Sequence, residues 1–116
     1  MLAHELARRR PDWQVRSAGV FVKNAGTTTD RAWRALVPEW SEPHSSKAVT
    51  LDDIAWADLV VATSVQQARA VMSSARPGIQ VVLKTIPDPN YEPRAAWPQI
   101  IVMIKRAAKS VAEGGV

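Results

Sequence analysis

A carboxylate lies between two prolines in the segment IPDPNY, residues 86–91, and a tyrosine follows it three positions later. Pro87 and Pro89 each fix one backbone dihedral, so they hold Asp88 in a rigid turn. A carboxylate held in this way could act as a general acid that protonates a leaving group. It could equally serve only the turn, by accepting hydrogen bonds from nearby backbone N–H groups. The choice depends on whether the chain offers a nucleophile for Asp88 to assist.

The obvious nucleophiles and metal ligands are missing from these 116 residues. The sequence contains no cysteine, which excludes disulfides, thiolate metal sites and a cysteine nucleophile within it. His4 and His44 are the only histidines, and neither has a ligand-type spacing to an acidic residue. Ser45 and Ser46 follow His44 without the glycine pattern of a serine hydrolase. We therefore expect no metal, no cofactor and no hydrolase site of these kinds.

Basic residues are concentrated at the two ends of the chain. The net charge is +4, and residues 1–34 hold seven Lys or Arg against three acids, residues 35–93 four against seven, and residues 94–116 four against one. Clustered cations can bind phosphate backbones or an acidic protein surface, although they also occur on ordinary solvated surfaces. No helix-turn-helix or other named DNA-binding motif is visible. The candidate binding residues are Arg8, Arg9, Arg10, Arg94, Lys105, Arg106 and Lys109.

Composition predicts one globular domain over residues 1–116, with 47% hydrophobic and 22% charged residues. No run approaches the roughly 20 apolar residues of a membrane span, and no signal-peptide pattern is present. We therefore expect a cytoplasmic protein without a membrane partner.

Periodicity predicts the elements that would position these residues. Helical spacing covers residues 2–10, 30–37, 51–56, 65–75 and 98–113, and β-branched or apolar runs cover residues 13–20, 57–64 and 79–86. Thr29 or Asp30 could cap the second helix, Thr50 with Asp53 and Ser64 with Gln67 form capping boxes, and Gly114 follows the last helix. Apolar strands that alternate with helices predict an α/β domain around a parallel sheet of three visible strands.

The five tryptophans are many for this length. Trp33 and Trp56 fall on predicted helices and are expected in the core. Trp13, Trp40 and Trp97 fall at loop edges, where an exposed tryptophan could mark an interface.

Several segments together resemble the low-molecular-weight protein tyrosine phosphatase family, which is similar in fold to the arsenate reductases. The matching segments are WQVRSAGV, GTTTDRAWRAL, HSSKAVTLDDIAWADLVVATS, IPDPNY and the closing amphipathic helix. The resemblance implies a three-layer, doubly wound parallel sheet of the phosphotyrosine protein phosphatase I type. Here it would be reduced to about three of the family's four strands.

The resemblance also implies roles for single residues. In the family, an N-terminal strand runs into a C-x5-R-[ST] phosphate-binding loop that opens the first helix, and only that helix has a counterpart here, in MLAHELARRR. Asp88 matches the family's general acid and Tyr91 the second of two cleft tyrosines, while Asn90 replaces the first. Without the thiolate, the loop or its arginine, we expect no phosphatase activity, and Asp88 and Tyr91 become vestiges.

The resulting prediction is a non-catalytic, phosphatase-like binding or regulatory module, with DNA as a partner for a basic face built from the first and last helices. Two alternatives stay open: a truncated fragment or mis-assigned start of an active phosphatase or arsenate reductase, and a protein–protein interaction module. In the family, the missing strand lies between the SAGV and LVVAT strands. Its absence predicts a sheet that closes the gap, forms a homodimer through the exposed edge, or receives a strand from a partner.

Overall fold

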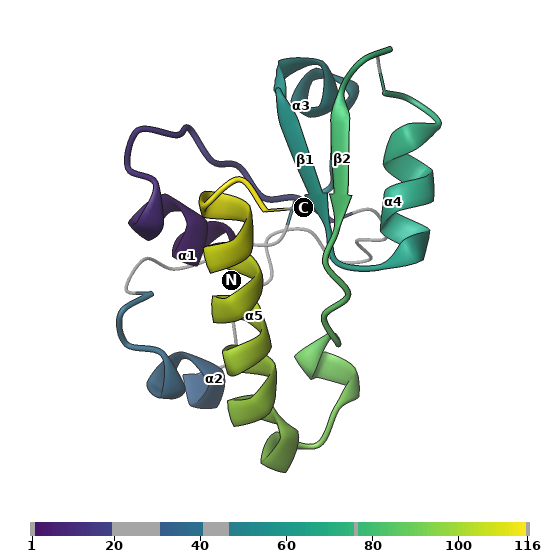
Figure 1. Ribbon diagram of the computed structural model, residues 1–116. Coiled ribbons are helices and arrows are strands. Elements are labelled where there is room, and N and C mark those ends of the chain that lie inside the picture. The colour runs from purple at the N-terminus through teal and green to yellow at the C-terminus, as the bar shows by residue number, and fades with distance from the viewer. Residues whose placement is uncertain (1, 20–30, 41–46, 76, 116) are drawn as a thin grey trace.

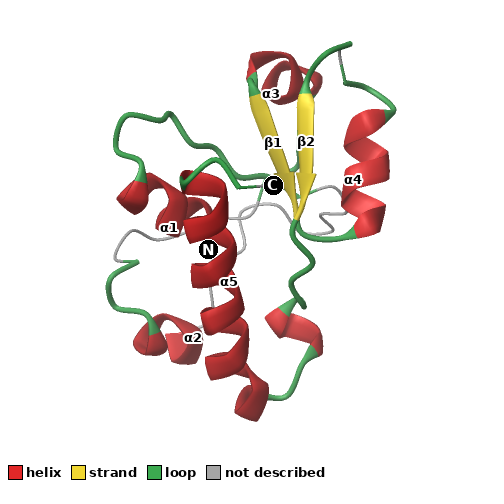
Figure 2. Cartoon of the chain, in the orientation of Figure 1, coloured by secondary structure: helices red, strands yellow, loops and turns green. Residues whose placement is uncertain are grey.

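The computed structural model describes residues 2–19, 31–40, 47–75 and 77–115. Within these residues the chain forms an α/β fold (Figures 1 and 2). Its elements are α1 (Leu2–Arg9), α2 (Arg31–Leu36), α3 (Leu51–Trp56), β1 (Leu59–Ala62), α4 (Val65–Met72), β2 (Gln80–Leu83), the short 3-10 helices η1 (Pro89–Tyr91) and η2 (Arg94–Ala96), and α5 (Trp97–Ala112). The predicted α/β class is confirmed.

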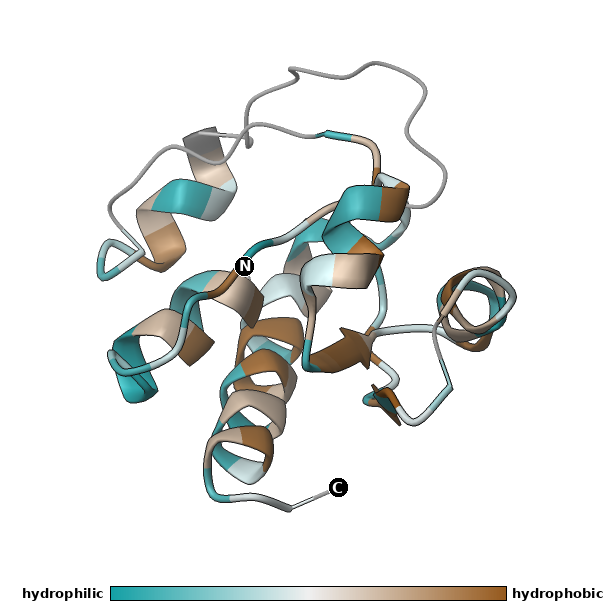
Figure 3. Cartoon of the chain, turned by 90° about the horizontal axis from the view of Figure 1, so that it is seen from above, coloured by the Kyte–Doolittle hydropathy of each residue, from teal (hydrophilic) through white to brown (hydrophobic). Residues whose placement is uncertain are grey.

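The sheet of the described residues is a parallel pair. β1 pairs with β2 in a register that sets Leu59 opposite Gln80 and Ala62 opposite Leu83. Both strands are largely hydrophobic (Figure 3), as expected for strands covered on both faces. α4 packs on one face, and α1 and α5 pack side by side on the other (Figure 1).

The strand predicted at residues 13–20 is not formed over its described part. Residues 14–18 have no regular secondary structure and appear as loop in Figure 2, and only Gly19 forms an isolated parallel bridge, to Ala48. A β-strand needs the backbone of a neighbour for its hydrogen bonds, and no described strand lies beside residues 14–18. The sheet therefore has two strands among the described residues, where the sequence predicted three.

Local capping signals set the starts of α3 and α4. The Thr50 hydroxyl accepts from the Asp53 N–H at 3.1 Å and Asp53 accepts from the Thr50 N–H at 3.1 Å, which confirms the first capping box. Ser64 accepts from the Gln67 N–H, but the Gln67 side chain accepts from Thr63 instead of Ser64, so the second box is only half formed. The cap predicted at Thr29 or Asp30 lies outside the described residues.

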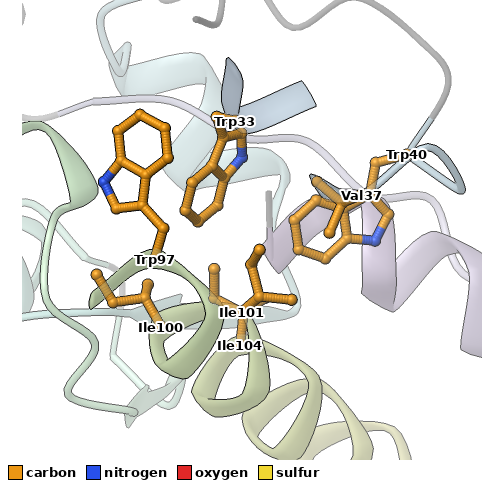
Figure 4. Close-up of a cluster of buried hydrophobic side chains, with 7 residues drawn as sticks. All are labelled: Trp33, Val37, Trp40, Trp97, Ile100, Ile101 and Ile104. Carbon is orange, nitrogen blue, oxygen red and sulfur yellow. The ribbon is translucent and has the colours of Figure 1, made fainter. Parts of the chain in front are cut away.

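Two core clusters hold the helices. The larger, shown in Figure 4, joins α2 and the turn after it to the first half of α5, and consists of Trp33, Val37, Trp40, Trp97, Ile100, Ile101 and Ile104. The Trp33 and Trp97 rings meet edge to face with centroids 5.6 Å apart. The smaller cluster joins the strands to α1 and the end of α5 through Leu6, Val82, Ala108 and Val111.

The tryptophan predictions are partly wrong. Trp33 is buried as expected, but Trp40 and Trp97 are also buried, because α2 and the turn after it pack against α5. Trp56 was expected in the core and is 37% exposed, with the Arg16 guanidinium 3.9 Å above its ring. No helix in the described part of the chain is long and apolar enough to cross a membrane.

Candidate functional site

Asp88 lies in the turn that leads from β2 to α5, where it caps η1. Its carboxylate accepts a hydrogen bond from the Asn90 N–H at 2.9 Å, and Pro89 occupies the first position of the 3-10 helix. The indole N–H of Trp97 donates to the Pro89 carbonyl at 3.1 Å and ties the turn to α5. The Asp88 side chain is exposed and caps this turn, which is one of the two roles that the sequence suggested for it.

Tyr91 does not wall a cleft in the described residues. Its side chain is 85% exposed at the end of η1, and the neighbouring Asn90 is exposed as well. An aromatic wall needs a ring packed on one side so that the other side can face a ligand. The structure therefore places Asp88 and Tyr91 on one short exposed turn.

The arginines of α1 are bound to acidic partners. Arg8 donates two hydrogen bonds to Glu5, at 2.8 and 3.1 Å, and Arg9 lies 3.9 Å from the same carboxylate. Glu5 is fully buried, and the Arg8 hydrogen bond holds its pKa below the ordinary value while raising the pKa of Arg8. Arg10 pairs with Asp12 at 2.7 Å.

Arg10 also joins the ends of the two basic helices. Its guanidinium donates to the carbonyl of Ala112 at 2.9 Å, so the C-terminal ends of α1 and α5 lie together. The hydrogen bond with Asp12 raises the pKa of Arg10 and lowers that of Asp12. The expected neighbourhood of Arg8–Arg10 and the end of α5 is therefore present, but its cations are largely neutralised locally.

The three basic residues of α5 differ in whether they have an acidic partner. Lys105 turns toward the segment after α2 and pairs with Glu39 at 2.7 Å, which lowers the pKa of Glu39. Arg106 and Lys109 are exposed and have no acidic partner within the described residues. They are three positions apart, which places them on one face of the helix.

Arg94 lies apart from this group. It precedes α5 and stacks over Trp97 with 5.6 Å between the guanidinium carbon and the ring centroid. Trp97 and Lys109 are twelve positions apart, which corresponds to about 18 Å of helix. The seven predicted cations therefore do not form one continuous patch of free charge.

A shallow depression of about 340 Å³ adjoins the exposed cations of α5. It is lined by Arg106, Lys109, Ser110, Glu113 and Gly115. Lys84, which the sequence did not single out, comes from the chain after β2 and donates to Ser110 Oγ at 3.1 Å. The pairing of Glu5 with Arg8 and Arg9 was visible in their helical spacing, whereas nothing in the sequence placed Lys84 or Glu39 beside α5.

The described residues contain no group of three His, Cys, Asp or Glu side chains that could hold a metal ion. His4 lies half-buried on α1. His44, Ser45 and Ser46 fall outside the described residues.

Comparisons with known proteins place this geometry in a fold family. No family model matches the chain, and no curated protein matches it by sequence. Similar solved structures include Wzb from Vibrio vulnificus in complex with benzylphosphonate, with 22% identity over 97% of this chain and 87% of that chain and a TM-score of 0.83. Another is the tyrosine phosphatase Wzb from Escherichia coli K30 in complex with sulphate, with 19% identity, 97% and 86% coverage and a TM-score of 0.81.

A third is a low-molecular-weight phosphotyrosine phosphatase from Vibrio cholerae O395, with 18% identity, 97% and 85% coverage and a TM-score of 0.79. Identities of this size show the fold and leave the activity open. The likeness extends over nearly the whole chain, and it confirms the fold that the sequence segments implied. The chain has the fold of the low-molecular-weight protein tyrosine phosphatases, in a sequence without cysteine.

Proposed function

We propose that this chain is a non-catalytic binding module of the low-molecular-weight phosphatase fold, and that it binds duplex DNA through the outward face of α5. The observation that supports the binding surface is the pair Arg106 and Lys109. Both are exposed on one face of α5 and lack an acidic partner among the described residues, whereas Lys105 on the same helix is bound to Glu39.

Two features support the absence of catalysis in this chain. Phosphatases of this type attack phosphorus with a cysteine thiolate, and the 116 residues contain no cysteine. Asp88, at the position of the family's general acid, is exposed and accepts a hydrogen bond from the Asn90 N–H. The purified chain should not hydrolyse a generic aryl phosphate above the buffer rate. Hydrolysis that survives further purification and follows the protein would overturn this part of the proposal.

The ion pairs limit how strongly salt should affect DNA binding. Arg8, Arg9, Arg10 and Lys105 have acidic partners, which leaves three of the seven candidate cations without one. The logarithm of the affinity falls with the logarithm of salt by about 0.9 per neutralised phosphate. Three contacts give a slope of about −2.7 and a loss of about 40-fold between 50 and 200 mM salt, against about −6 for seven contacts.

The test is a salt titration of duplex binding by fluorescence anisotropy. Arg106→Gln with Lys109→Gln should weaken binding and reduce the slope by about 1.8, because two phosphate contacts are lost. The matched control is Arg16→Gln with Lys47→Gln, which removes two cations that lie near Asp53 instead of α5. Absence of binding at 50 mM salt, or a slope near zero, would refute DNA binding and favour a protein partner.

A second candidate is a piece of an active phosphatase. The match covers 97% of this chain but only 82–88% of the six phosphatase structures. Inspection of the coding sequence directly upstream of Met1 tests it. An in-frame C-x5-R-[ST] motif there would support the phosphatase and would overturn the non-catalytic module.

A further inference from the structure

Polar and charged side chains surround the shallow depression at the end of α5. Arg106, Ser110 and Glu113 follow one another at helical spacings of four and three residues, and Lys109 lies beside them on the same helix. Ser110 is half-buried, whereas the three charged residues are exposed. The hydroxyl therefore lies deeper in the depression than the charges around it.

Lys84 brings a third cation to this depression from the end of β2. Its backbone N–H still pairs with β1, at 2.9 Å, so the strand geometry continues to this residue. Side chains two positions apart share one face of a strand, and Val82 belongs to the core cluster that contains Ala108 of α5. Lys84 therefore points toward the same helix, and its ammonium donates to Ser110 Oγ at 3.1 Å. Within the described residues it has no acidic partner.

The Ser110 hydroxyl can still donate a hydrogen bond to a ligand. It accepts from Lys84, and none of the hydrogen bonds between described residues uses its own proton. An anion oxygen bound to that proton would lie about 2.7 Å from Oγ, and so within about 6 Å of the Lys84 ammonium. Gly115 leaves the hydroxyl uncovered, because a Cβ at this position would lie 2.8 Å from Ser110 Oγ.

The backbone at the end of α5 opposes an anion less than a free helix end would. Carbonyls at the C-terminal end of a helix usually disfavour negative charge. Here the last four carbonyls already accept hydrogen bonds, three from the N–H groups of Glu113, Gly114 and Gly115 and one, on Ala112, from the Arg10 guanidinium. The chain itself thus caps this end, partly with a cation.

The charge around the depression matches a phosphate with three free oxygens. Three cations and the Glu113 carboxylate give a formal charge of +2. A phosphomonoester carries about −1.5 to −2 at pH 7, whereas each phosphodiester in a DNA strand carries one negative charge. A strand that continued along α5 would also bring a further phosphate toward Glu113, which repels it. A strand that ends at the depression avoids this repulsion.

We propose that the depression binds a phosphomonoester, the terminal phosphate of a DNA strand. Arg106 and Lys109 contact the phosphate oxygens, and the Ser110 hydroxyl donates to one of them. Lys84 acts as a positioning residue, because it orients the hydroxyl and adds its charge from behind the direct contacts. This inference rests on the proposed DNA binding, since both use Arg106 and Lys109.

The test compares three forms of one short blunt-ended duplex by fluorescence anisotropy at 50 mM salt. One form has 5′-phosphates, one has 3′-phosphates and one has hydroxyls at all ends. At least one phosphorylated form should bind the 116-residue chain about tenfold more tightly than the hydroxyl form, the effect of one hydrogen bond to a charged group. Equal affinities for all three forms would overturn the inference and leave duplex binding itself intact.

The variants test whether the preference arises at this depression. Lys84→Met keeps the apolar stem and removes the charge, and Ser110→Ala removes the hydroxyl, so each should lower the ratio of the two affinities at least threefold. Gly115→Ala should lower it as well, because its Cβ displaces the Ser110 hydroxyl. The matched control is Lys47→Met, which removes a cation near Asp53 and should leave the ratio unchanged. A ratio that stays the same in both Lys84→Met and Ser110→Ala would overturn the inference.

Inorganic phosphate separates this inference from the proposed function. Followed by NMR, it should shift the backbone amide resonances of Ser110 and Gly115 in the parent chain and much less in Ser110→Ala. The same shifts without binding of any duplex would support the phosphate site and refute DNA as its partner. Alanine favours a helix, so Ser110→Ala should fold, which circular dichroism verifies.

Discussion

The buried carboxylate of Glu5 depends on its ion pair with Arg8. Its carboxylate is fully buried on α1 and accepts two hydrogen bonds from Arg8. Arg8→Ala leaves that carboxylate with the more distant Arg9, at 3.9 Å, and the Trp40 side chain, and it removes the strongest of its partners. A lost hydrogen bond to a charged group costs about 1.5–3 kcal/mol, and the Arg8 side chain is 54% exposed, so we expect the lower half of that range, about 2 kcal/mol.

Glu5→Leu should cost much less than Arg8→Ala, although it removes the buried partner itself. Leucine fills a similar volume among apolar neighbours, and Arg8 can return to water, so no buried charge is left unpaired. We expect Glu5→Leu to lie within about 1 kcal/mol of the parent chain. The matched control is Arg69→Ala on α4, an exposed arginine without an ion pair among the described contacts, with an expected effect below about 0.5 kcal/mol.

The assay is urea unfolding followed by tryptophan fluorescence, with thermal melts in parallel. For 116 residues, 2 kcal/mol corresponds to a melting shift of about 8 °C. The pKa of Glu5 is lowered in the fold from 4.5, mainly by Arg8, so its ionised form stabilises the protein above that pH. That contribution is lost as the pH falls through the folded pKa. The penalty of Arg8→Ala should therefore be constant near pH 7 and shrink below about pH 4.5.

The loss of stability in each variant shows whether an unpaired carboxylate is the cause. If Glu5→Leu destabilises the chain as much as Arg8→Ala, the cost lies in packing and the argument from an unpaired carboxylate is refuted. If the penalty of Arg8→Ala does not change down to pH 3, Glu5 does not ionise in the fold and the ion pair does not exist in solution.

Two further predictions concern packing and capping. Trp97→Ala should cost about 3–5 kcal/mol in urea unfolding because it empties the centre of the larger core cluster. Trp97→Phe keeps an aromatic ring and loses only the hydrogen bond to the Pro89 carbonyl, so it should lower the free energy of unfolding by about 1 kcal/mol. Equal losses of stability in the two variants would contradict the role of the ring. Thr50→Ala should cost about 1 kcal/mol and speed hydrogen exchange of the Asp53 amide, with Thr50→Ser as the near-neutral control. Unchanged exchange would rule out the cap.

Local signals in the sequence were sufficient for most of the secondary structure. The helical spacing of residues 98–113 matches α5, and the capping box at Thr50 and Asp53 marks the start of α3. Such signals work because a helix is stabilised by residues within one or two turns of each other. The absence of cysteine is likewise read directly from the sequence. The set of short matching segments predicted the fold that the solved phosphatases share.

Contacts between distant residues could not be predicted in this way. The Lys105–Glu39 pair joins positions 66 residues apart, and it removes one cation from the expected basic face. Trp40 and Trp97 look like loop-edge residues in the sequence and are buried, because α2 and the turn after it pack on α5. In each case the free energy of a side chain depends on which neighbours exclude water from it, and only the packed chain supplies them.

The segment of residues 13–19 shows the same division. Its alternating pattern matches the alternation of half-buried and exposed side chains in the structure, since that depends on side-chain polarity along the segment. It could not predict a ladder, because β-sheet hydrogen bonds are made to another segment. The sequence determines the polarity of each side chain, whereas strand pairing requires the tertiary structure to bring two backbones together.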